Sequence, residues 1–393
     1  MDRAEVLTNT SLLLESSEDT TPWDPFQRPL TTVQPWNFKL LAALMFLVTA
    51  LSLSENFIVI LVTAKFKQLR QPLNYIIVNL SVADFLVSLI GGSISFLTNS
   101  RGYFYLGPWT CMLEGFAVTF FGIVALWSLA ILAFERFIVI CRPLGNLRLR
   151  GKHSALGIVF VWVFSFIWTI PPTLGWSSYT TSKIGTTCEP NWYSGKYNDH
   201  TYIITFFTTC FILPLLVISI SYGKLMRKLR KVSDTQGRSG STRKPEREVT
   251  RMVVIMILAF LICWSPYAAF SILATACPSI HLDPRLASIP AFFAKTASVY
   301  NPIIYVFMNK QFRRCLLQMF HCNVKEATES NINQTSERAM LNRDTQGGEM
   351  HTIGAHLTHT NINSRKSEDE QSSCNSFAQL PIADNKYFCS PVV

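Results

Sequence analysis

Lys295 is the residue whose type and position most directly suggest chemistry. It lies within Ala291-Phe-Phe-Ala-Lys295-Thr-Ala-Ser-Val-Tyr-Asn301-Pro302-Ile-Ile-Tyr305, an otherwise apolar stretch of membrane-spanning length. An ionisable side chain inside a membrane costs several kcal/mol unless another group pairs with it or uses it. The alternative is that its long stem carries the amine to the lipid headgroups. The apolar run continues to Met308, about 13 residues or roughly 20 Å further, which is too far for that.

Glu114 is the acid that best matches this lysine. It follows Cys111 by one helical turn at the outer end of another apolar run, and Lys295 lies about a third of the way down its own run, so the two match in depth. A buried lysine without a partner loses its proton, whereas a carboxylate within about 4–6 Å restores the charged form. The alternative is a salt bridge between helices with no further role.

The elements that position these residues are predicted to be seven membrane-spanning helices. The chain has 393 residues, of which 49% are hydrophobic and only 15% charged, and its mean hydropathy is +0.24. This composition indicates a polytopic membrane protein. The strict alternation of a barrel strand is absent, so the spans must be helices. The apolar runs are Leu40–Ala64, Leu73–Phe96, Cys111–Ile140, Ala155–Leu174, Tyr202–Tyr222, Met252–Ala274 and Leu286–Met308.

The distribution of Lys and Arg predicts the orientation of the chain. The first, third and fifth connections are rich in them, as in Lys224–Arg251, whereas the alternate connections hold only Arg101, Lys183, Lys196 and Arg285. We therefore expect a multi-pass protein of the plasma membrane with its amino terminus extracellular and its carboxyl terminus cytoplasmic. Met1–Thr32 has no apolar signal-peptide region. The net charge of +10 fits this topology and attraction to anionic lipids, and not nucleic-acid binding.

The cysteines divide according to this topology. Cys188 lies in the second outer loop and Cys111 at an outer helix end, on the face that matures in an oxidising compartment, so a Cys111–Cys188 disulfide is favoured. We expect Cys210 and Cys263 to be small apolar core residues. Reduced cytoplasmic cysteines are expected at Cys141, Cys315, Cys322, Cys374 and Cys389.

Polar residues and prolines inside the apolar runs predict internal contacts and bends. Asn56 and Asp84 need partners within lipid, so we expect them to share a buried polar network. Each proline removes a hydrogen-bond donor and crowds the carbonyl four residues back, which bends a helix. Bends are therefore expected at Pro171-Pro172, Pro214, Pro266 and Pro302. Such bends can act as pivots, although static bundles contain them too.

Four regions follow from these patterns. Residues 1–37 form an extracellular tail in which Asn9-Thr10-Ser11 is a glycosylation sequon. The bundle occupies residues 38–309. Residues 310–322 are apolar on one face and cationic on the other, which predicts a short helix on the inner leaflet, with Cys322 available for S-acylation. Residues 323–393 have the composition of a disordered cytoplasmic tail open to kinases. The fold class is thus an all-α seven-helix membrane bundle with a short amphipathic eighth helix.

From Leu40 to Cys322 the chain resembles the rhodopsin-like (class A) G-protein-coupled receptors and, within them, the opsins. The motifs that carry this resemblance occur on the expected helices in the expected order. They are Asn56, Leu-Ser-Val-Ala-Asp84, Cys111, Glu135-Arg136-Phe137, Trp162, Pro214, Tyr222, Cys263-Trp264-Ser265-Pro266 and Asn301-Pro302-Ile-Ile-Tyr305. Lys295, six residues before Asn301-Pro302, looks like the lysine that binds the chromophore in opsins. The stretches Cys-Arg-Pro-Leu-Gly-Asn146 and Ile-Gly-Thr-Thr-Cys188-Glu-Pro-Asn-Trp192 look most like the teleost multiple tissue opsins, relatives of encephalopsin, which implies a non-visual photoreceptor.

The resemblance implies retinal as cofactor, 11-cis in the dark and covalently bound to Lys295 as a Schiff base. Glu114 would be its counterion, because the acid that many opsins carry six residues before the loop cysteine is Ser182 here. The usual Tyr after the third-helix Arg is Phe137, a change that leaves the Glu135–Arg136 pair intact. The resemblance places eight further residues in the pocket: Thr119, Gly122, Phe207, Phe211, Trp264, Tyr267, Ala291 and Ala294.

Light would act through Trp264 and the Pro266 bend to release Arg136 from Glu135 and from Glu246, after which Tyr222 and Tyr305 rearrange. The implied partners are a heterotrimeric G protein, of the i/o or transducin-like type, then a receptor kinase and arrestin. The implied role is signalling and not catalysis. Three alternatives stay open: a receptor of the same fold for a diffusible ligand, a retinal photoisomerase, and a transporter or ion pump. Internal repeats and charges along a pathway, which would favour the last, are absent.

Overall fold

The computed structural model describes residues 22–141, 151–235, 244–278 and 282–320, without the side chains of 229–235 and 244–247. The chain divides into two units. Residues 1–237 and 248–316 form the first, which contains the helical bundle described below apart from the opening residues of one helix. The second unit comprises residues 238–247 and 317–393. Its described residues are 244–247, at the start of one helix, and 317–320, at the end of another.

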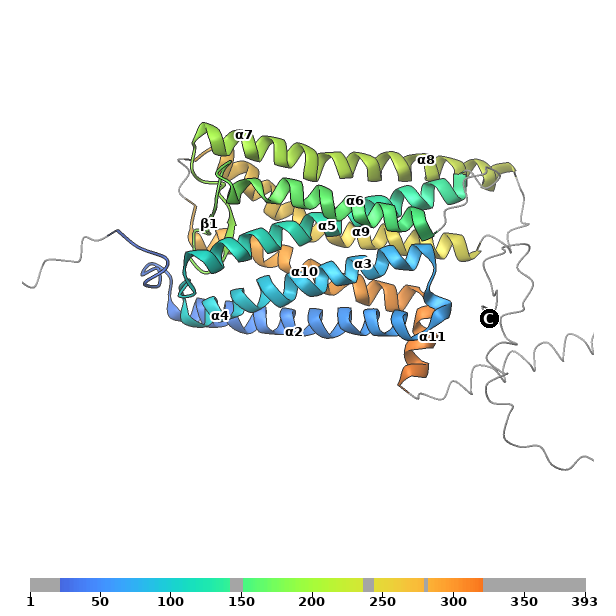
Figure 1. Ribbon diagram of the computed structural model, residues 1–393, viewed down its shortest axis with the longest axis horizontal. Helices are drawn as coiled ribbons and strands as arrows, with labels where there is room; N and C mark the ends of the chain where they lie inside the picture. The colour runs from blue at the N-terminus through green and yellow to red at the C-terminus, as the bar shows by residue number, and fades with distance from the viewer. Residues whose placement is uncertain (1–21, 142–150, 236–243, 279–281, 321–393) are drawn as a thin grey trace, which may run out of the picture. The chain divides into compact units, whose positions relative to one another are not determined.

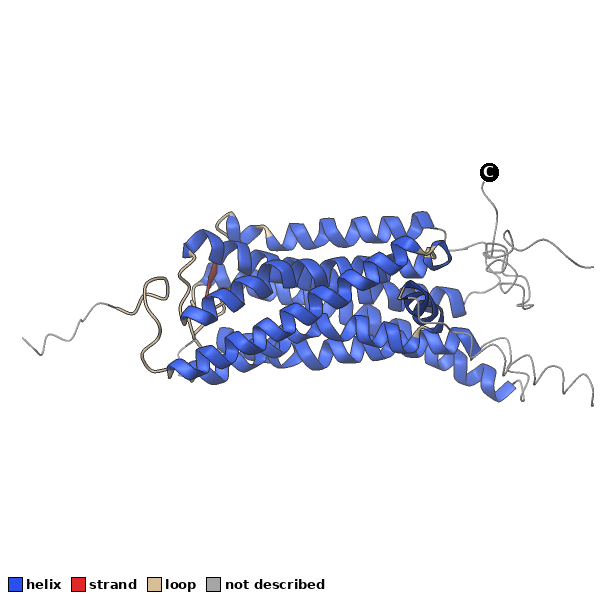
Figure 2. Cartoon of the chain, turned by 90° about the horizontal axis from the view of Figure 1, so that it is seen from below, coloured by secondary structure: helices blue, strands red, loops and turns tan. Residues whose placement is uncertain are grey.

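The first unit consists of long helices that run side by side (Figures 1 and 2). Two of the seven spans are interrupted by a π-helical turn, so each of these two carries more than one label. The spans are α2 (Pro35–Lys65), α3 (Pro72–Val87) with η2 (Ser88–Gly92) and α4 (Ser93–Arg101), α5 (Gly107–Cys141), α6 (Gly151–Thr169), α7 (Tyr197–Phe206) with η4 (Phe207–Ile212) and α8 (Leu213–Thr235), α9 (Lys244–Ala276) and α10 (Pro284–Met308). Shorter elements are η1 (Lys67–Leu69), η3 (Pro171–Thr173) and α11 (Lys310–Met319).

The helices confirm the predicted bundle and extend beyond its apolar runs. Six spans of the described chain are long and apolar enough to cross a membrane. The seventh, α10, has 25 residues, which at about 1.5 Å each is enough for a core of about 30 Å. The greatest extension is in the fifth span, which continues into the basic segment after Tyr222, because a helix carries on through polar flanks that hydropathy does not count.

Prolines start two helices and end another. Pro35 and Pro72 occupy the first turns of α2 and α3. A backbone N–H at these positions would have no hydrogen-bond partner within the helix, so its absence in proline costs nothing. Pro171 and Pro172 were predicted to bend the fourth span, but they end it: α6 stops at Thr169 and a single 3₁₀ turn follows. Two successive residues without donors cannot continue an α-helix. Pro266 and Pro302 lie inside α9 and α10 as expected, and Pro214 follows the π-helical turn η4.

The π-helical turn η2 brings α4 close to α2 and shifts the residues after it. A Cβ atom on Gly92 would lie 2.5 Å from Thr49 Oγ1, so a larger residue would require the Thr49 side chain of α2 to shift. The turn adds a residue to the helical repeat, which rotates the side chains that follow. One of these is Ser95, which is fully buried and belongs to the site described below.

Helix α5 forms the middle of the bundle. Each of residues 123–130 is buried, as expected for a helix that is surrounded on all faces. At one end of the bundle, β1 (Tyr179–Thr181) and β2 (Cys188–Pro190) pair antiparallel, with Thr180 opposite Glu189 (Figures 1 and 2). This hairpin was not predicted from the sequence. It belongs to the loop between α6 and α7 and packs against the start of α5.

The start of α11 packs on the opposite end of α10. The Tyr305 and Phe312 rings lie 4.6 Å apart between centroids, and Phe312 is fully buried. Gln68 Nε2 contacts Cys315 Sγ at 3.2 Å. The structure confirms a short helix after the seventh span, and these contacts bury two of its residues, Phe312 and Cys315.

Candidate functional site

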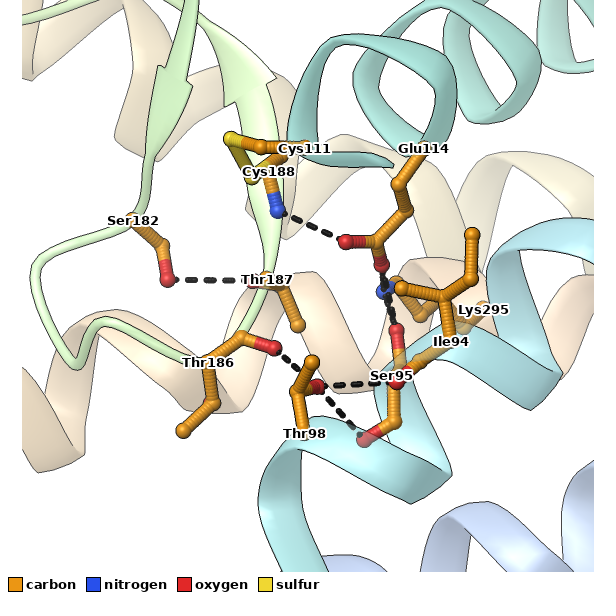
Figure 3. Close-up of a disulfide and its surroundings, with 10 residues drawn as sticks. All are labelled: Ile94, Ser95, Thr98, Cys111, Glu114, Ser182, Thr186, Thr187, Cys188 and Lys295. Carbon is orange, nitrogen blue, oxygen red and sulfur yellow. Dashed lines mark hydrogen bonds and ion pairs between the residues drawn. A yellow bond between two sulfur atoms is a disulfide. The ribbon is translucent and has the colours of Figure 1, made fainter. Parts of the chain in front are cut away.

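An ion pair between α10 and α5 lies at the centre of the candidate site. Lys295 Nζ is 3.0 Å from Glu114 Oε1. Ser95 of α4 donates a 2.6 Å hydrogen bond to the same oxygen and accepts one from Lys295 (Figure 3). The Glu114 side chain is fully buried and that of Lys295 is 14% exposed. The structure thus brings together the two residues that were predicted to pair because they lie at similar depths in their apolar runs. Ser95 was not predicted, because a serine in a helix carries no distinguishing signal.

The second oxygen of Glu114 is held by the outer hairpin. The backbone N–H of Cys188 donates a 3.0 Å hydrogen bond to Glu114 Oε2. Glu114 therefore has three donors: Lys295, Ser95 and the Cys188 N–H. The predicted Cys111–Cys188 disulfide is present and ties β2 to the first turns of α5 (Figure 3). Cys277, which the sequence reasoning left out, is exposed and unpaired.

Removing the disulfide is expected to destabilise the protein by about 2–5 kcal/mol, because the bond closes a loop of 77 residues. The Cys111→Ser variant would show this as a lower thermal midpoint in detergent. Cys277→Ser, which changes an exposed unpaired thiol, is the matched control and should alter stability by less than about 0.5 kcal/mol. Equal midpoints for Cys111→Ser and the control would contradict this role of the disulfide.

A cavity extends from Lys295 between the helices. The space between the atoms that line it is about 890 Å³, a figure that includes space open to solvent. Lys295 and all eight residues that the resemblance placed in a pocket line it: Thr119, Gly122, Phe207, Phe211, Trp264, Tyr267, Ala291 and Ala294. Most of its other lining residues are apolar or aromatic. Those that sequence reasoning did not identify include Ile123, Thr187, Cys188, Pro190, Trp192, Phe206 and Phe260.

Trp264 forms part of the cavity wall at the point where α9 approaches α5. A Cβ atom on Gly122 would lie 3.1 Å from Trp264 Cη2, so only glycine lets the indole approach without a shift. The indole stacks on Phe260, with centroids 5.6 Å apart, and meets the Tyr267 ring edge-on at 6.1 Å. Trp264 is thus held by its neighbours, two residues before the Pro266 bend.

Glu189 of β2 is a second acid in the cavity wall. It is buried, and its two carboxylate oxygens accept hydrogen bonds from Tyr193 OH at 2.6 Å and Tyr267 OH at 2.5 Å. Trp192 Nε1 donates to Tyr267 OH at 3.1 Å. Burial raises the pKa of Glu189, and the two tyrosine hydroxyls oppose that rise. Its place in the cavity depends on the hairpin, for which the sequence offered no signal.

The inner end of the bundle holds the pair Glu135–Arg136. Two hydrogen bonds of 2.5 and 2.6 Å join the guanidinium and carboxylate groups, both of which are buried. The buried hydroxyl of Tyr222 has no hydrogen-bond partner among the described residues, so it is available for a different arrangement of this end. The side chain of Glu246 lies outside the described residues, and its predicted contact with Arg136 stays a prediction.

Asn56 and Asp84 both have buried hydrogen-bond partners, but these belong to two separate groups, and the network that the two residues were expected to share stays a prediction. Asn56 Nδ2 donates to the carbonyls of Ser52 and Ser298 at 2.9 and 3.0 Å. Asn301 Nδ2 donates to Asp84 Oδ2 at 2.9 Å. Both groups join α10 to its neighbours. Nearer the carboxyl-terminal end of α10, Tyr305 OH donates to Asn74 Oδ1 at 3.0 Å.

Several predictions fall outside the described residues: glycosylation at Asn9, S-acylation at Cys322 and the state of the carboxyl-terminal tail. Within the described residues, no group of three or more His, Cys, Asp or Glu side chains is placed to hold a metal ion.

Comparison with known proteins gives consistent matches. A family model described as "7 transmembrane receptor (rhodopsin family)" matches residues 55–305. The chain is 68% identical to Opsin-VA of Rutilus rutilus over 92% of its length and 95% of the relative's. It is 69% identical to the vertebrate ancient opsin of Salmo salar over 79% of its own length and 96% of that protein's length. It is 63% identical to the pineal opsin of Petromyzon marinus over 82% of its own length and 74% of that protein's length. Its fold is similar to a crystal structure of squid rhodopsin, with a TM-score of 0.71, 25% identity and coverage of 79% of this chain and 94% of that one.

Proposed function

Since the chain belongs to the rhodopsin family of seven-transmembrane receptors and, within it, to the opsins, we propose that Lys295 and Glu114 are the centre of its light-sensing site. The chain is a multi-pass membrane protein and a non-visual photoreceptor that binds retinal and signals through heterotrimeric G proteins. Its role is that of a receptor and not of an enzyme. The observation that supports the proposed site most is the buried pair of Lys295 and Glu114, 3.0 Å apart at one end of a largely apolar cavity.

The residues of the cavity fit retinal. The molecule is an apolar polyene with one aldehyde, and the cavity has one amine, that of Lys295, among mainly apolar and aromatic walls. We propose that Lys295 holds 11-cis-retinal covalently, through its nitrogen, and that Glu114 is the counterion that keeps this nitrogen protonated. Retinal supplies the absorption of light and the change of shape that follows. Ser95 and the Cys188 N–H fix the Glu114 carboxylate in position.

The path from the cavity to the inner face is proposed to run through α9. Trp264 lines the cavity and lies two residues before Pro266, so a displacement of the indole can turn the inner half of α9 about this bend. Outward movement of that half would free Arg136 from Glu135, and Tyr222 would then supply its hydroxyl to the new arrangement. Tyr305 would exchange its present bond to Asn74 for a new contact. The opened inner end would accept a helix of the G protein.

Finer assignments are also proposals. The Lys and Arg distribution supports an extracellular amino terminus and a location in the plasma membrane. We propose a G protein of the i/o or transducin-like type, and a receptor kinase and arrestin acting on the carboxyl-terminal tail. Membership of the multiple tissue opsins stays a prediction from two loop stretches. The identities of 68% and 69% to Opsin-VA and a vertebrate ancient opsin favour a place near those proteins.

The experiment that tests this function uses the purified full-length protein. It is reconstituted with 11-cis-retinal in the dark, its spectrum is recorded, and nucleotide exchange on a G protein of the i/o class is followed before and after illumination. We expect a visible band and light-dependent exchange. A band without exchange, together with net release of isomerised retinal under continuous light, would favour a photoisomerase. No band at all would favour a receptor for a diffusible ligand.

The Glu189→Gln variant separates the two acids of the cavity. Glu114 and not Glu189 contacts Lys295 directly, so the dark band of Glu189→Gln should stay in the visible range at neutral pH. Glutamine retains one carbonyl oxygen to accept from a tyrosine, which keeps the hairpin in place. The measurement is the dark spectrum. A shift of the band into the ultraviolet would assign the counterion role to Glu189 instead.

A further inference from the structure

A second, smaller cavity reaches Lys295 from the outer side. It lies between α2, α4, α10 and the loop that carries the hairpin, and its polar lining residues are Asn99, Ser182, Thr186, Thr187 and Ser288 besides Lys295. We refer to it as the Asn99–Thr186 cavity. Ser288 is only partly buried, near the outer end of α10, whereas Asn99 and Thr186 are 2% and 1% exposed. The cavity therefore runs from near the outer surface to the lysine.

Two buried polar atoms in this cavity lack a protein partner. Among the described residues, no atom hydrogen-bonds to Asn99 Oδ1 or Thr186 Oγ1. The Asn99 side chain is held in place because its Nδ2 donates to Ser95 O at 2.7 Å. The backbone of Thr186 is held by Thr98 Oγ1, which donates to the Thr186 carbonyl at 2.6 Å (Figure 3). Buried polar atoms without partners cost about 1–3 kcal/mol each, so a ligand that satisfies both is strongly favoured.

The size and chemistry of the cavity indicate that this ligand is water. About 30 Å³ is available to the centres of water molecules, and a single bound water needs about 10–15 Å³. The lining offers several hydroxyl and amide groups, and a buried water typically makes about three hydrogen bonds. The larger cavity is mostly apolar and suits retinal, so it differs in kind from the Asn99–Thr186 cavity.

We propose that the Asn99–Thr186 cavity binds the water that hydrolyses the bond between Lys295 and retinal after illumination, so that the receptor releases its spent chromophore. This inference rests on the proposed function. In the reaction the water oxygen becomes the aldehyde oxygen and the carbon–nitrogen bond breaks. Both water protons end on the lysine nitrogen, which becomes an ammonium group. Charge and atoms balance with water as the sole co-reactant, and no oxidant or reductant is required.

The roles of the two side chains follow from their chemistry. Asn99 Oδ1 is an acceptor, so water donates one proton to it and keeps a lone pair for attack. Thr186 Oγ1 can donate to the water or accept from it, which fixes the orientation of the molecule. Ser95 joins this cavity to the ion pair, because its carbonyl accepts from Asn99 and its hydroxyl contacts both Lys295 and Glu114. The ammonium product therefore forms next to a carboxylate that stabilises it.

The test compares Thr186→Val and Asn99→Leu with the wild type, all full-length and reconstituted with 11-cis-retinal. After a flash, samples are denatured in acid at intervals and the fraction of retinal still bound covalently is measured. Thr186→Val removes only the unpartnered hydroxyl with little change of volume, whereas Asn99→Leu removes Oδ1 together with the Nδ2 donor to Ser95 O. A normal dark band shows that each variant folds. We expect release to slow about fivefold in each, the effect of one ordinary hydrogen bond. Thr49→Val is the matched control, because Thr49 Oγ1 is also buried without a partner among the described residues but lines a third cavity, which borders Lys295 and does not include Asn99 or Thr186.

The outcomes separate the two proposals. If Thr186→Val and Asn99→Leu release retinal as fast as the wild type, the proposed water site is wrong. It is also wrong if the control Thr49→Val slows release by the same factor as these two variants. A high-resolution structure of the retinal-free protein gives an independent check, which should show water bound to Asn99 and Thr186, whereas a dry cavity overturns the proposal. If the wild type forms no visible band at all, the proposed function fails and this inference fails with it. A normal band with unchanged release refutes only the water site.

Discussion

Replacing Lys295 with alanine is expected to abolish the visible absorption band of the protein reconstituted with 11-cis-retinal. Alanine has no amine to join to the aldehyde, so any retinal that enters the cavity would absorb in the ultraviolet as the free molecule. Light-dependent nucleotide exchange on the G protein should fall to the level seen in the dark. The measurements are the dark spectrum and the exchange assay, each made on wild type and variant at equal concentration.

Two further variants make this result specific. Lys295→Ala also leaves the fully buried Glu114 without its cation, which can cost about 3–5 kcal/mol and impair folding. Lys295→Arg keeps a positive charge beside Glu114, but a guanidinium does not condense with an aldehyde under these conditions, so it too should lack the band. Lys310→Ala removes a lysine whose side chain is 64% exposed and pairs with Glu248, and its spectrum should be unchanged. A visible band in either Lys295 variant would refute the assignment.

Replacing Glu114 with glutamine is expected to move the dark band into the ultraviolet at neutral pH. Glutamine has nearly the same shape, and its single carbonyl oxygen can still accept from Ser95 or from the Cys188 N–H, so the negative charge is lost together with one of these two hydrogen bonds. Removing one partner of a buried ion pair destabilises the remaining charge by about 3–5 kcal/mol. The proton on the linking nitrogen would then be lost at neutral pH, and the protein would absorb visible light only in acid. The measurement is a spectrum at a series of pH values.

Glu189→Gln is the matched control for this variant, because it neutralises the other acid of the same cavity. The two spectra together decide which carboxylate faces the linking nitrogen. If Glu114→Gln kept its visible band at neutral pH while Glu189→Gln lost it, the roles assigned here would be reversed. If both variants kept the band, each acid could replace the other, and the double variant would be expected to lose it.

Much of this fold and site could be predicted because lipid imposes strict requirements. Apolar runs of sufficient length had to be helices, and a lysine in one run had to find an acid at the same depth in another. That argument alone paired Lys295 with Glu114, and the outer location of Cys111 and Cys188 paired those two. The residues that the opsin resemblance placed in a pocket line a single cavity, since the spacing of residues on a helix determines which of them face the interior.

The rest depends on backbone geometry that apolar patterns do not encode. Ser95 reaches the ion pair only because a π-helical turn rotates α4, and serines are too common in helices to distinguish one. Glu189 and Trp192 reach the cavity because a hairpin of two three-residue strands packs against the bundle. Pro171 and Pro172 ended a helix that hydropathy had continued through them. Each of these features follows from local hydrogen bonding, to which hydropathy is insensitive.

The central claim, that Lys295 is the residue to which retinal attaches, is tested most directly by mapping the attachment. The reconstituted protein is treated with borohydride in the light, which reduces the bond between nitrogen and retinal to a stable amine, and is then digested and examined by mass spectrometry. The account predicts a retinyl group on the peptide that contains Lys295 and on no other lysine. A retinyl group on a different lysine, or retinal bound with no covalent adduct, would contradict it.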